Sequence, residues 1–320
     1  MVKQPFCSSL LKGRNILKID LDGLTRFCQQ NSISCRTDTP MREYTTFKVG
    51  GNATFSALPS SAEELTLLVR ELRRIGAEPV WFVGRGSNLL VSDEGLDGVV
   101  VFTWGLSELK REEQTVIADA GVGMNALCRM AQSEGLTGLE FAYGIPGTVG
   151  GGVFMNAGAY GGEMRDVLEW VEYLDETGEV KRLPKEKLEL SYRRSVFSTH
   201  PQWCILRAAF RLEQGDRQQI GDKMSELMAR RREKQPLEYP SAGSTFKRPE
   251  GAFAGSLIEQ CGLKGTRVGN AQVSEKHAGF IINLGGATCA QINELIEKVQ
   301  QTVFERTGYQ LEPEVRRLGK

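Results

Sequence analysis

Residues 144–162 read GIPGTVGGGVFMNAGAYGG, and this stretch decides the fold because eight of its nineteen positions are glycine. Such a density of glycine predicts neither a conventional strand nor a conventional helix. A second loop of this kind, GRGSN, occupies residues 84–88. Glycine backbone can approach a phosphate or lie against a flat ring, because no Cβ keeps it away. One such loop could equally serve a tight turn, but two in one chain favour a bound nucleotide or flavin.

The shorter loop follows a β-α-β pattern without completing a dinucleotide-binding fingerprint. A strand over 53–58, a helix that begins near Ser61 and stops at Gly76, and a buried strand over 80–83 precede it. Leu89 stands where the third glycine of GxGxxG would be, and residues 89–93 have no helical pattern. A Rossmann fold is therefore not predicted.

Strand and helix patterns alternate irregularly along the rest of the chain, which predicts an α+β protein. Strands are expected near 99–102, 115–118, 167–174, 180–183, 204–212 and 280–282, and helices near 125–133, after 216, and from Thr288 to Gly308. A polar link at 213–216 suggests a domain boundary. We therefore divide the chain into a segment of unclear role (1–40), a first domain (41–213) and a second domain (214–320).

Composition excludes several classes of function. Lys plus Arg and Asp plus Glu both number 40, so no net charge attracts nucleic acid. Seven scattered cysteines without a CxxC pair and only two histidines argue against a disulfide framework and against a zinc or histidine-based metal site. A carboxylate site for a hard cation stays open, and we expect no metal. No apolar stretch reads as a signal peptide or a membrane span, so we expect a cytoplasmic protein without membrane insertion. No obligate protein partner is evident.

Several polar residues could carry chemistry, although each has a simpler explanation. The basic run 230–234 is expected at a helix C-terminus, where cations offset the helix dipole; with Lys247 and Arg248 it could also clamp a diphosphate. Ser244 lacks the GxSxG context of an acyl-transfer nucleophile and could be a turn residue. Glu314 could be a surface carboxylate, and Tyr192 with Arg193 an exposed turn.

Six motifs in a fixed order resemble the UDP-N-acetylenolpyruvoylglucosamine reductase family over about residues 46–319. They are VGRGSN (83–88), GIPGTVGG (144–151), MNAGAYG (155–161), SYRRS (191–195), AGSTF (242–246) and LEPEV (311–315). The short interval between Arg193 and Ser244 is similar to that of type II members, which lack an inserted loop over the substrate diphosphate. The resemblance implies a FAD-binding domain of the vanillyl-alcohol-oxidase type, made of two subdomains, followed by an α+β substrate-binding domain.

The resemblance also implies an activity and its residues. The expected reaction is FAD-dependent reduction by NADPH of UDP-N-acetylglucosamine enolpyruvate to UDP-N-acetylmuramate, with NADPH and the UDP-amino sugar alternating in one cleft. Arg193, Ser244 and Glu314 match the family's catalytic positions, with Ser244 as proton donor. The expected cofactor-binding residues are Gly84, Arg85, Gly86, Ser87, Asn88, Gly121, Ile145, Pro146, Gly147, Thr148, Gly151 and Asn156. The expected substrate-binding residues are Tyr192, Arg231, Lys234 and Arg248.

Two other functions are compatible with parts of the pattern. A FAD-dependent oxidase of alcohols or sugars would explain the glycine loops but not the motifs around Ser244 and Glu314. A catalytically inactive nucleotide-binding regulator would keep the fold, but all three catalytic positions hold competent residues.

Overall fold

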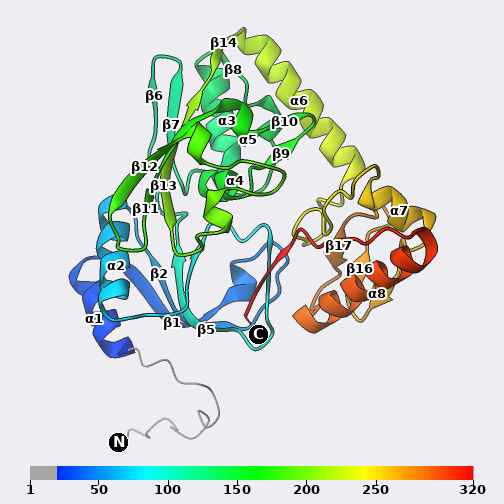
Figure 1. The fold of residues 1–320 in the computed structure, drawn as a ribbon, viewed down its shortest axis with the longest axis horizontal. Helices are drawn as coiled ribbons and strands as arrows, with labels where there is room; N and C mark the ends of the chain where they lie inside the picture. Colours follow the sequence, from blue (N-terminus) through cyan, green and yellow to red (C-terminus); the bar gives the residue numbers. More distant parts are fainter. Residues whose placement is uncertain (1–19, 320) are drawn as a thin grey trace, which may run out of the picture.

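The computed structural model describes residues 20–319, in which two mixed subdomains are followed by a smaller C-terminal domain (Figure 1). Residues 1–19, part of the segment of unclear role, lie outside the described residues. No helix within 20–319 is long and apolar enough to cross a membrane.

The first subdomain is a four-stranded sheet with two helices packed on it. The sheet order is β1-β2-β5-β3, with β1 antiparallel to β2 and both β2 and β3 parallel to β5. Its elements are α1 (Leu21–Gln30), β1 (Ser34–Pro40), β2 (Asn52–Leu58), α2 (Ala62–Arg74), β3 (Val80–Val83), β4 (Leu89–Val91) and β5 (Leu96–Phe102). Leu24 and Cys28 of α1 are buried in the same core as Leu68 of α2. Residues 20–40 are therefore part of this subdomain.

Local signals place α2 as the sequence predicted. Ser61 is the N-cap and its side chain accepts a hydrogen bond from the backbone N–H of Glu64. The helix ends at Arg74, and Gly76 follows with a φ of +64°, which glycine adopts without strain. The loop over 84–88 leads into strand β4, which confirms that no Rossmann helix follows it.

The second subdomain is built on a five-stranded antiparallel sheet of order β12-β11-β13-β7-β6. Helices α3, α4 and α6 contribute to a core on one of its faces (Figure 1). Its elements are β6 (Leu109–Glu112), β7 (Thr115–Asp119), α3 (Met124–Ser133), β8 (Leu136–Thr137), α4 (Val149–Phe154), β9 (Gly158–Ala159), β10 (Gly162–Glu163), α5 (Met164–Val167), β11 (Leu168–Leu174), β12 (Val180–Pro184), β13 (Cys204–Arg211), β14 (Glu213–Gln214) and α6 (Arg217–Lys234).

The glycine-rich stretch is more regular than its composition predicted. It contains helix α4 and the small β9-β10 hairpin, so the expectation that it forms neither helix nor strand is wrong. Tertiary packing explains this, because a Cβ at Gly150 would come within 2.9 Å of Ala120 and one at Gly152 within 3.0 Å of Met164. Close approach of the helix to its neighbours outweighs the low helix propensity of glycine.

The C-terminal domain has a separate core, to which Phe47, Val49 and Leu90 of the first subdomain also contribute. Its elements are α7 (Ala254–Gln260), β15 (Arg267–Val268), β16 (Ala271–Val273), β17 (Ile281–Asn283), α8 (Cys289–Thr307) and β18 (Arg316–Leu318). A capping box between Thr288 and Gln291 starts α8, and Gly308 with a φ of +76° ends it, as predicted.

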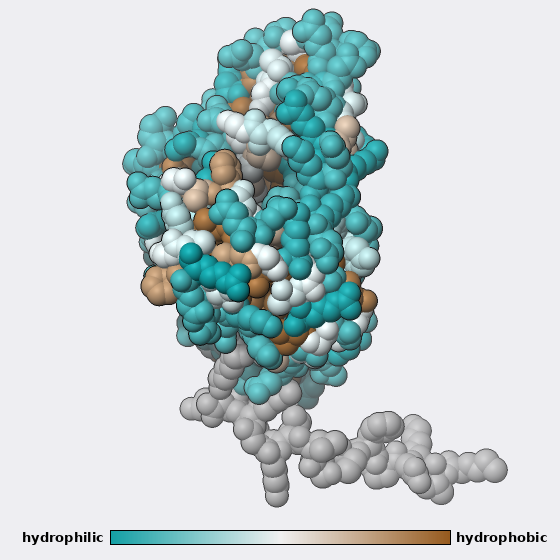
Figure 2. Space-filling view, turned by 90° about the vertical axis from the view of Figure 1, so that its right-hand side faces the viewer, coloured by the Kyte–Doolittle hydropathy of each residue, from teal (hydrophilic) through white to brown (hydrophobic). Residues whose placement is uncertain are grey.

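The side of the molecule turned to the viewer in Figure 2 is mostly hydrophilic with small apolar patches.

The packing of helix α6 concerns the domain boundary that the sequence predicts between residues 213 and 214. Helix α6 begins just after it, yet Ile220 and Met224 of α6 are buried in the core of the second subdomain. The core of the C-terminal domain includes no residue between 91 and 241. Within the C-terminal part of the chain, its first residue is Ala242. The boundary stays a prediction, and we propose to move it to the end of α6.

Strand β18 and helix α8 each join the C-terminal domain to the first subdomain. Strand β18 pairs in parallel with β4, with Arg316 opposite Leu89. The Asp93 carboxylate accepts hydrogen bonds from the backbone N–H groups of Cys289 at 2.8 Å and Ala290 at 2.9 Å. These N–H groups open α8 and have no partner within the helix. A carboxylate from one domain thus caps a helix of the other.

We expect Asp93→Ala to lower the free energy of unfolding by about 1–2 kcal/mol, because two N–H groups at the helix N-terminus lose an anionic acceptor. Urea denaturation followed by circular dichroism measures the loss. Glu94→Ala is the matched control, since Glu94 is the adjacent exposed acid and its removal should change stability by less than about 0.5 kcal/mol. Equal effects of the two substitutions would contradict the capping role.

Candidate active site

A cleft of about 2160 Å³ is lined by residues of both subdomains and of the C-terminal domain. Most of the predicted site residues line it. They are Gly84, Arg85, Gly86, Ser87, Asn88, Ile145, Pro146, Gly147, Thr148, Gly151, Tyr192, Arg193, Arg231, Lys234, Ser244, Arg248 and Glu314. The fold thus brings together segments that are far apart in the sequence.

Two predicted cofactor residues, Gly121 and Asn156, are not among those that line the cleft. A Cβ on Gly121 would come within 2.2 Å of the Thr103 carbonyl oxygen, so glycine is needed there for close backbone packing. Asn156 is fully buried, and its amide donates to Glu163 Oε2 and to the Ser191 carbonyl oxygen, both at 3.1 Å. Asn156 therefore braces the backbone behind the cleft.

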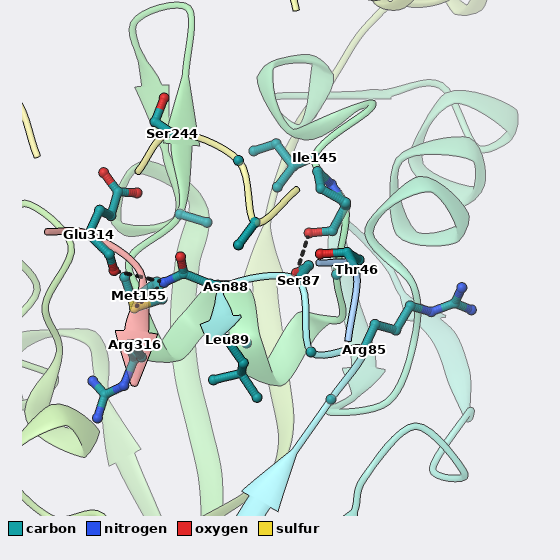
Figure 3. Close-up of a pocket in the computed structure, with 18 of the residues that line it drawn as sticks. Thr46, Arg85, Ser87, Asn88, Leu89, Ile145, Met155, Ser244, Glu314 and Arg316 are labelled. Carbon is teal, nitrogen blue, oxygen red and sulfur yellow. Dashed lines mark hydrogen bonds between the residues drawn. The ribbon is translucent and has the colours of Figure 1, made fainter. Parts of the chain in front are cut away.

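The two glycine loops contact each other across the cleft floor. Ser87 Oγ donates to the Pro146 carbonyl oxygen at 2.9 Å, and a Cβ on Gly84 would come within 2.5 Å of Thr148 Oγ1 (Figure 3). Gly86 has a φ of +61°, and a Cβ there would strike the Tyr44 carbonyl oxygen. Glycine at these positions lets one loop close against its neighbours.

Unsatisfied polar atoms in and beside these loops fit a ligand with phosphate or carbonyl oxygens. The hydroxyls of Thr46 and Thr148 are buried and have no hydrogen-bond partner among the described residues, which is rare and costly unless a ligand or water satisfies them. Gly151 leaves open space, because a Cβ there meets only Thr148 Oγ1, at 3.8 Å. The pyrophosphate and flat ring of FAD fit this combination of exposed backbone, free donors and open space.

Glu314 lies where the three structural units meet. Its backbone N–H donates to the Thr245 carbonyl oxygen at 2.8 Å, and its carbonyl oxygen accepts from Asn88 Nδ2 at 3.2 Å (Figure 3). Its carboxylate oxygen Oε1 is 2.5 Å from Nε of Arg193. Each unit therefore holds a different group of the same residue.

Two opposed effects set the protonation of Glu314. Burial raises the pKa of its carboxyl above the usual range, while the Arg193 guanidinium acts in the opposite direction. Burial is the larger effect, so the protonated form is favoured more than in water. The ion-pair geometry and the raised pKa are compatible, since a neutral carboxyl can still accept from Arg193 through its carbonyl oxygen.

Ser244 is positioned by a short antiparallel pairing. The Lys247 N–H donates to the Glu312 carbonyl oxygen at 2.8 Å, and Phe246 forms a bridge with Pro313. Because Thr245 then lies opposite Glu314, Ser244 is one residue from the acid across this ladder. In Figure 3, Ser244 and Glu314 lie on the left of the view, and Ser87 and Ile145 lie to their right.

Arg193 lies in a tight turn that aims its side chain across the cleft. Its φ is +56°, a left-handed conformation that is costly for a residue with a Cβ. The hydrogen bonds between Ser191 and Arg194 close the turn. Nη2 of Arg193 also donates to the Gly158 carbonyl oxygen at 3.4 Å. The predicted exposed turn is present, but the arginine points inward.

The residues of the predicted basic run at the end of α6 have different surroundings in the structure. Arg231 is only 6% exposed, and its Nε and Nη2 have no hydrogen-bond partner among the described residues. It lies beside Gly144 and 5.1 Å from the ring of Tyr160. Lys234 is exposed at the helix end and Arg230 pairs with Glu226. Arg231 and Lys234 are thus the two basic members of the run that line the cleft.

Sequence reasoning missed Arg316 as a cleft residue. It is two residues after Glu314, its guanidinium lies 4.5 Å from the Phe154 ring, and burial lowers its pKa. The LEPEV motif stopped one residue short of it. Arg231 and Arg316 together make the cleft locally cationic in a chain of zero net charge.

Comparisons with known proteins agree with this geometry. Residues 53–184 match the family described as FAD binding domain, and residues 235–318 match UDP-N-acetylenolpyruvoylglucosamine reductase, C-terminal domain. A relative named UDP-N-acetylenolpyruvoylglucosamine reductase from Caldanaerobacter subterraneus subsp. tengcongensis is 49% identical over 88% of this chain and 92% of its own. A relative of the same name from Caldicellulosiruptor saccharolyticus is 45% identical over 92% of this chain and 95% of its own.

A solved structure is also similar. UDP-N-acetylenolpyruvylglucosamine reductase from Thermus caldophilus aligns with a TM-score of 0.75 and 36% identity, covering 90% of this chain and 99% of that one. The expected fold class is confirmed: a FAD-binding domain of the vanillyl-alcohol-oxidase type with two subdomains, followed by a smaller α+β domain.

We expect Gly151→Leu to fold normally but to lose bound flavin. Leucine raises helix propensity by about 0.8–1 kcal/mol over glycine, and the protein itself leaves room for a Cβ at this position. The larger side chain would occupy the space that FAD needs. The ratio of flavin to protein absorbance measures binding, and the melting temperature of the apoprotein measures folding.

The control is wild-type apoprotein, which should recover its flavin absorbance when FAD is added and release the flavin on acid precipitation, because binding is non-covalent. A Gly151→Leu protein that carries a full complement of FAD would show that the flavin does not lie against this glycine.

Proposed function

The chain belongs to the UDP-N-acetylenolpyruvoylglucosamine reductase family, and from this membership we propose that Arg193, Glu314 and Ser244 carry out its chemistry. The protein is an NADPH-dependent flavin oxidoreductase. It uses FAD to reduce UDP-N-acetylglucosamine enolpyruvate to UDP-N-acetylmuramate in peptidoglycan precursor synthesis. The observation that carries the residue assignment is the junction at which Thr245, Asn88 and Arg193 hold Glu314.

The residues that would hold FAD are those of the two glycine loops, 84–88 and 145–148, together with Gly151. Their backbone N–H groups and the free hydroxyls of Thr46 and Thr148 suit its oxygens. When bound and reduced, FAD would supply the hydride for the enolpyruvyl double bond. The protein must then stabilise the negative charge that develops on the substrate and deliver a proton.

Arg193 is suited to bind the enolpyruvyl carboxylate. Its planar, permanently charged fork suits a carboxylate. Its Nε is bonded to Glu314 and its Nη2 makes a long bond of 3.4 Å to the Gly158 carbonyl oxygen, so Nη1 and the second proton on Nη2 remain for the substrate. The constrained turn at residues 191–194 holds the guanidinium in the cleft before substrate arrives. Electron density that moves toward the carboxylate is thereby neutralised where it accumulates.

Glu314 is suited to act as a neutral hydrogen-bond donor to the same group. Its raised pKa favours the protonated form, which can stabilise an enolate by donating a proton to a hydrogen bond. A substrate carboxylate bound at Arg193 would add a negative charge nearby and favour protonation further.

Ser244 is suited to donate the proton to carbon. A hydroxyl is a weak acid, but a carbanion next to a carboxylate is far more basic than water, so the transfer is favourable. Its place one residue from Glu314 across the ladder supports this role. Tyr192, Arg231, Lys234 and Arg248, which line the same cleft, would hold the rest of the sugar nucleotide.

We place the reaction in the cytoplasm, because NADPH and a sugar nucleotide must both reach the cleft. Roles in cell-wall biogenesis, cell shape, cell division and the cell cycle would follow from precursor supply. Fractionation of the cells tests the location.

We expect Ser244→Ala to leave reduction by NADPH near its normal rate and to slow reoxidation by the enolpyruvyl substrate about a hundredfold to ten-thousandfold. The first step needs no proton at the substrate carbon, whereas the second does. Anaerobic stopped-flow absorbance resolves both steps: NADPH should bleach the flavin and the substrate should restore it.

Ser244→Cys is the matched variant, because a thiol is a stronger acid of similar size and should recover part of the rate. If alanine slowed both steps equally, or neither, Ser244 would be a structural turn residue. If the wild-type flavin were bleached by NADPH but not restored by the substrate, the proposed reaction itself would be wrong.

We expect the substrate step to be pH-dependent through Glu314. Its protonated form is the active one, so the rate should be full below its raised pKa and fall as pH rises through it. Glu314→Gln should be slower but lose this alkaline fall, since the amide stays neutral at every pH. Glu312→Gln, which changes an exposed acid paired with Lys247, should keep it. An alkaline fall that persists in Glu314→Gln would assign the titration to another group.

A further inference from the structure

Phe253 is the most exposed large apolar side chain in the described part of the chain. It is 59% exposed and lines the cleft at the start of α7. A single exposed apolar residue needs no explanation by itself. Its contacts, however, connect it to the catalytic arginine.

Four side chains form a continuous series along the cleft, here called the rim: Arg193, Tyr192, Arg248 and Phe253. The Arg193 guanidinium lies 5.0 Å from the centre of the Tyr192 ring. The Tyr192 hydroxyl accepts a hydrogen bond from the Arg248 backbone N–H at 3.1 Å. The Arg248 guanidinium lies 4.4 Å from the centre of the Phe253 ring. All four residues line the cleft.

The chemical order along the rim matches the order of groups in a sugar nucleotide that carries an enolpyruvyl group. Such a molecule runs from a carboxylate through a hexose and a diphosphate to a nucleoside. The rim offers a guanidinium, an aromatic ring, a second guanidinium and a second aromatic ring. Guanidinium groups suit carboxylate and phosphate, and aromatic rings suit the flat faces of a sugar or a base.

We propose that Phe253 is a stacking platform for the uracil base of the substrate and that Arg248, beside it, holds the diphosphate. This inference rests on the proposed function and extends it to the far end of the same cleft. Arg248 covers one face of the Phe253 ring, yet the residue stays 59% exposed. The opposite face is therefore the one open to a base.

The rim also places the platform on a rigid support. Arg248 follows directly after Lys247, whose N–H pairs with the Glu312 carbonyl oxygen, so the ladder that positions Ser244 continues to the base of Arg248. Ser244 and Arg248 are four residues apart, so at about 3.3 Å per residue they lie at most about 13 Å from each other. That separation suits a hexose and a diphosphate between the reacting carbon and the base.

The test measures binding to the oxidised holoenzyme, by the change in flavin absorbance or by competition with the substrate. The two probes are UDP and inorganic pyrophosphate, which lacks a base. Phe253→Ala should weaken UDP binding roughly tenfold to a hundredfold, the usual range for loss of one base-stacking ring, and leave pyrophosphate binding unchanged. Arg248→Ala should weaken the binding of both probes.

Two variants serve as controls. Phe253→Tyr keeps the ring and should retain most of the affinity for UDP. Phe304→Ala removes a comparably exposed ring, 56% exposed on α8 and outside the cleft, and should change neither constant. Flavin content and melting temperature confirm that each variant is folded.

Several results would overturn the proposal. Phe253→Ala that binds UDP as well as the wild type does, or that weakens pyrophosphate as much as UDP, would show that the ring does not contact the base. Loss of NADPH affinity with UDP affinity intact would assign the ring to a base of NADPH. If the wild type binds no UDP at all, the proposed function fails together with this inference; in the other cases only the inference fails.

Discussion

The active-site geometry depends on the way the backbone of Glu314 is held between two domains. Its N–H belongs to the ladder with residues 244–248 of the C-terminal domain, and its C=O is bound by Asn88 of the first subdomain. Two residues later the chain enters β18 and pairs with β4. A sheet edge and a loop side chain thus fix the acid relative to the glycine loops. Without this pairing, these contacts would no longer hold Ser244 and Glu314 in place relative to the two glycine loops.

Local charge, rather than net charge, makes the cleft suitable for anions. The chain as a whole is neutral, but Arg231 is buried in the cleft wall and its Nε and Nη2 have no hydrogen-bond partner among the described residues. Arg316 lines the same cleft but is more exposed to water. Burial of an unpaired guanidinium is costly unless a ligand supplies the counter-charge. A nucleotide, a flavin carbonyl or a sugar diphosphate would each recover part of that cost. The unliganded protein therefore keeps a buried cation unpaired, and an anionic ligand that pairs with this cation gains binding free energy.

The sequence predicted what local signals control. The caps of α2 and α8, the rejection of a Rossmann helix after Asn88 and the motif residues of the cleft all depend on a few neighbouring positions. It did not predict what depends on distant packing. Helix α4 forms because Ala120 and Met164 leave room only for glycine, and α6 joins the second core through Ile220 and Met224. No local sequence pattern predicts such contacts.

The same distinction applies to the predicted residues that do not line the cleft and to the cleft residues that carry no motif. Gly121 packs closely against the backbone of residues 103–106, and the Asn156 side chain bonds to the Ser191 carbonyl oxygen; neither residue is among those that line the cleft. Arg316 and Phe253 carry no motif, and only their position on β18 and at the start of α7 brings them to the cleft. Motifs identify segments, whereas the direction of each side chain follows from the packing of the segment. For a site assembled from three units, the sequence can therefore predict which segments take part. The role of each residue in those segments follows only from the fold.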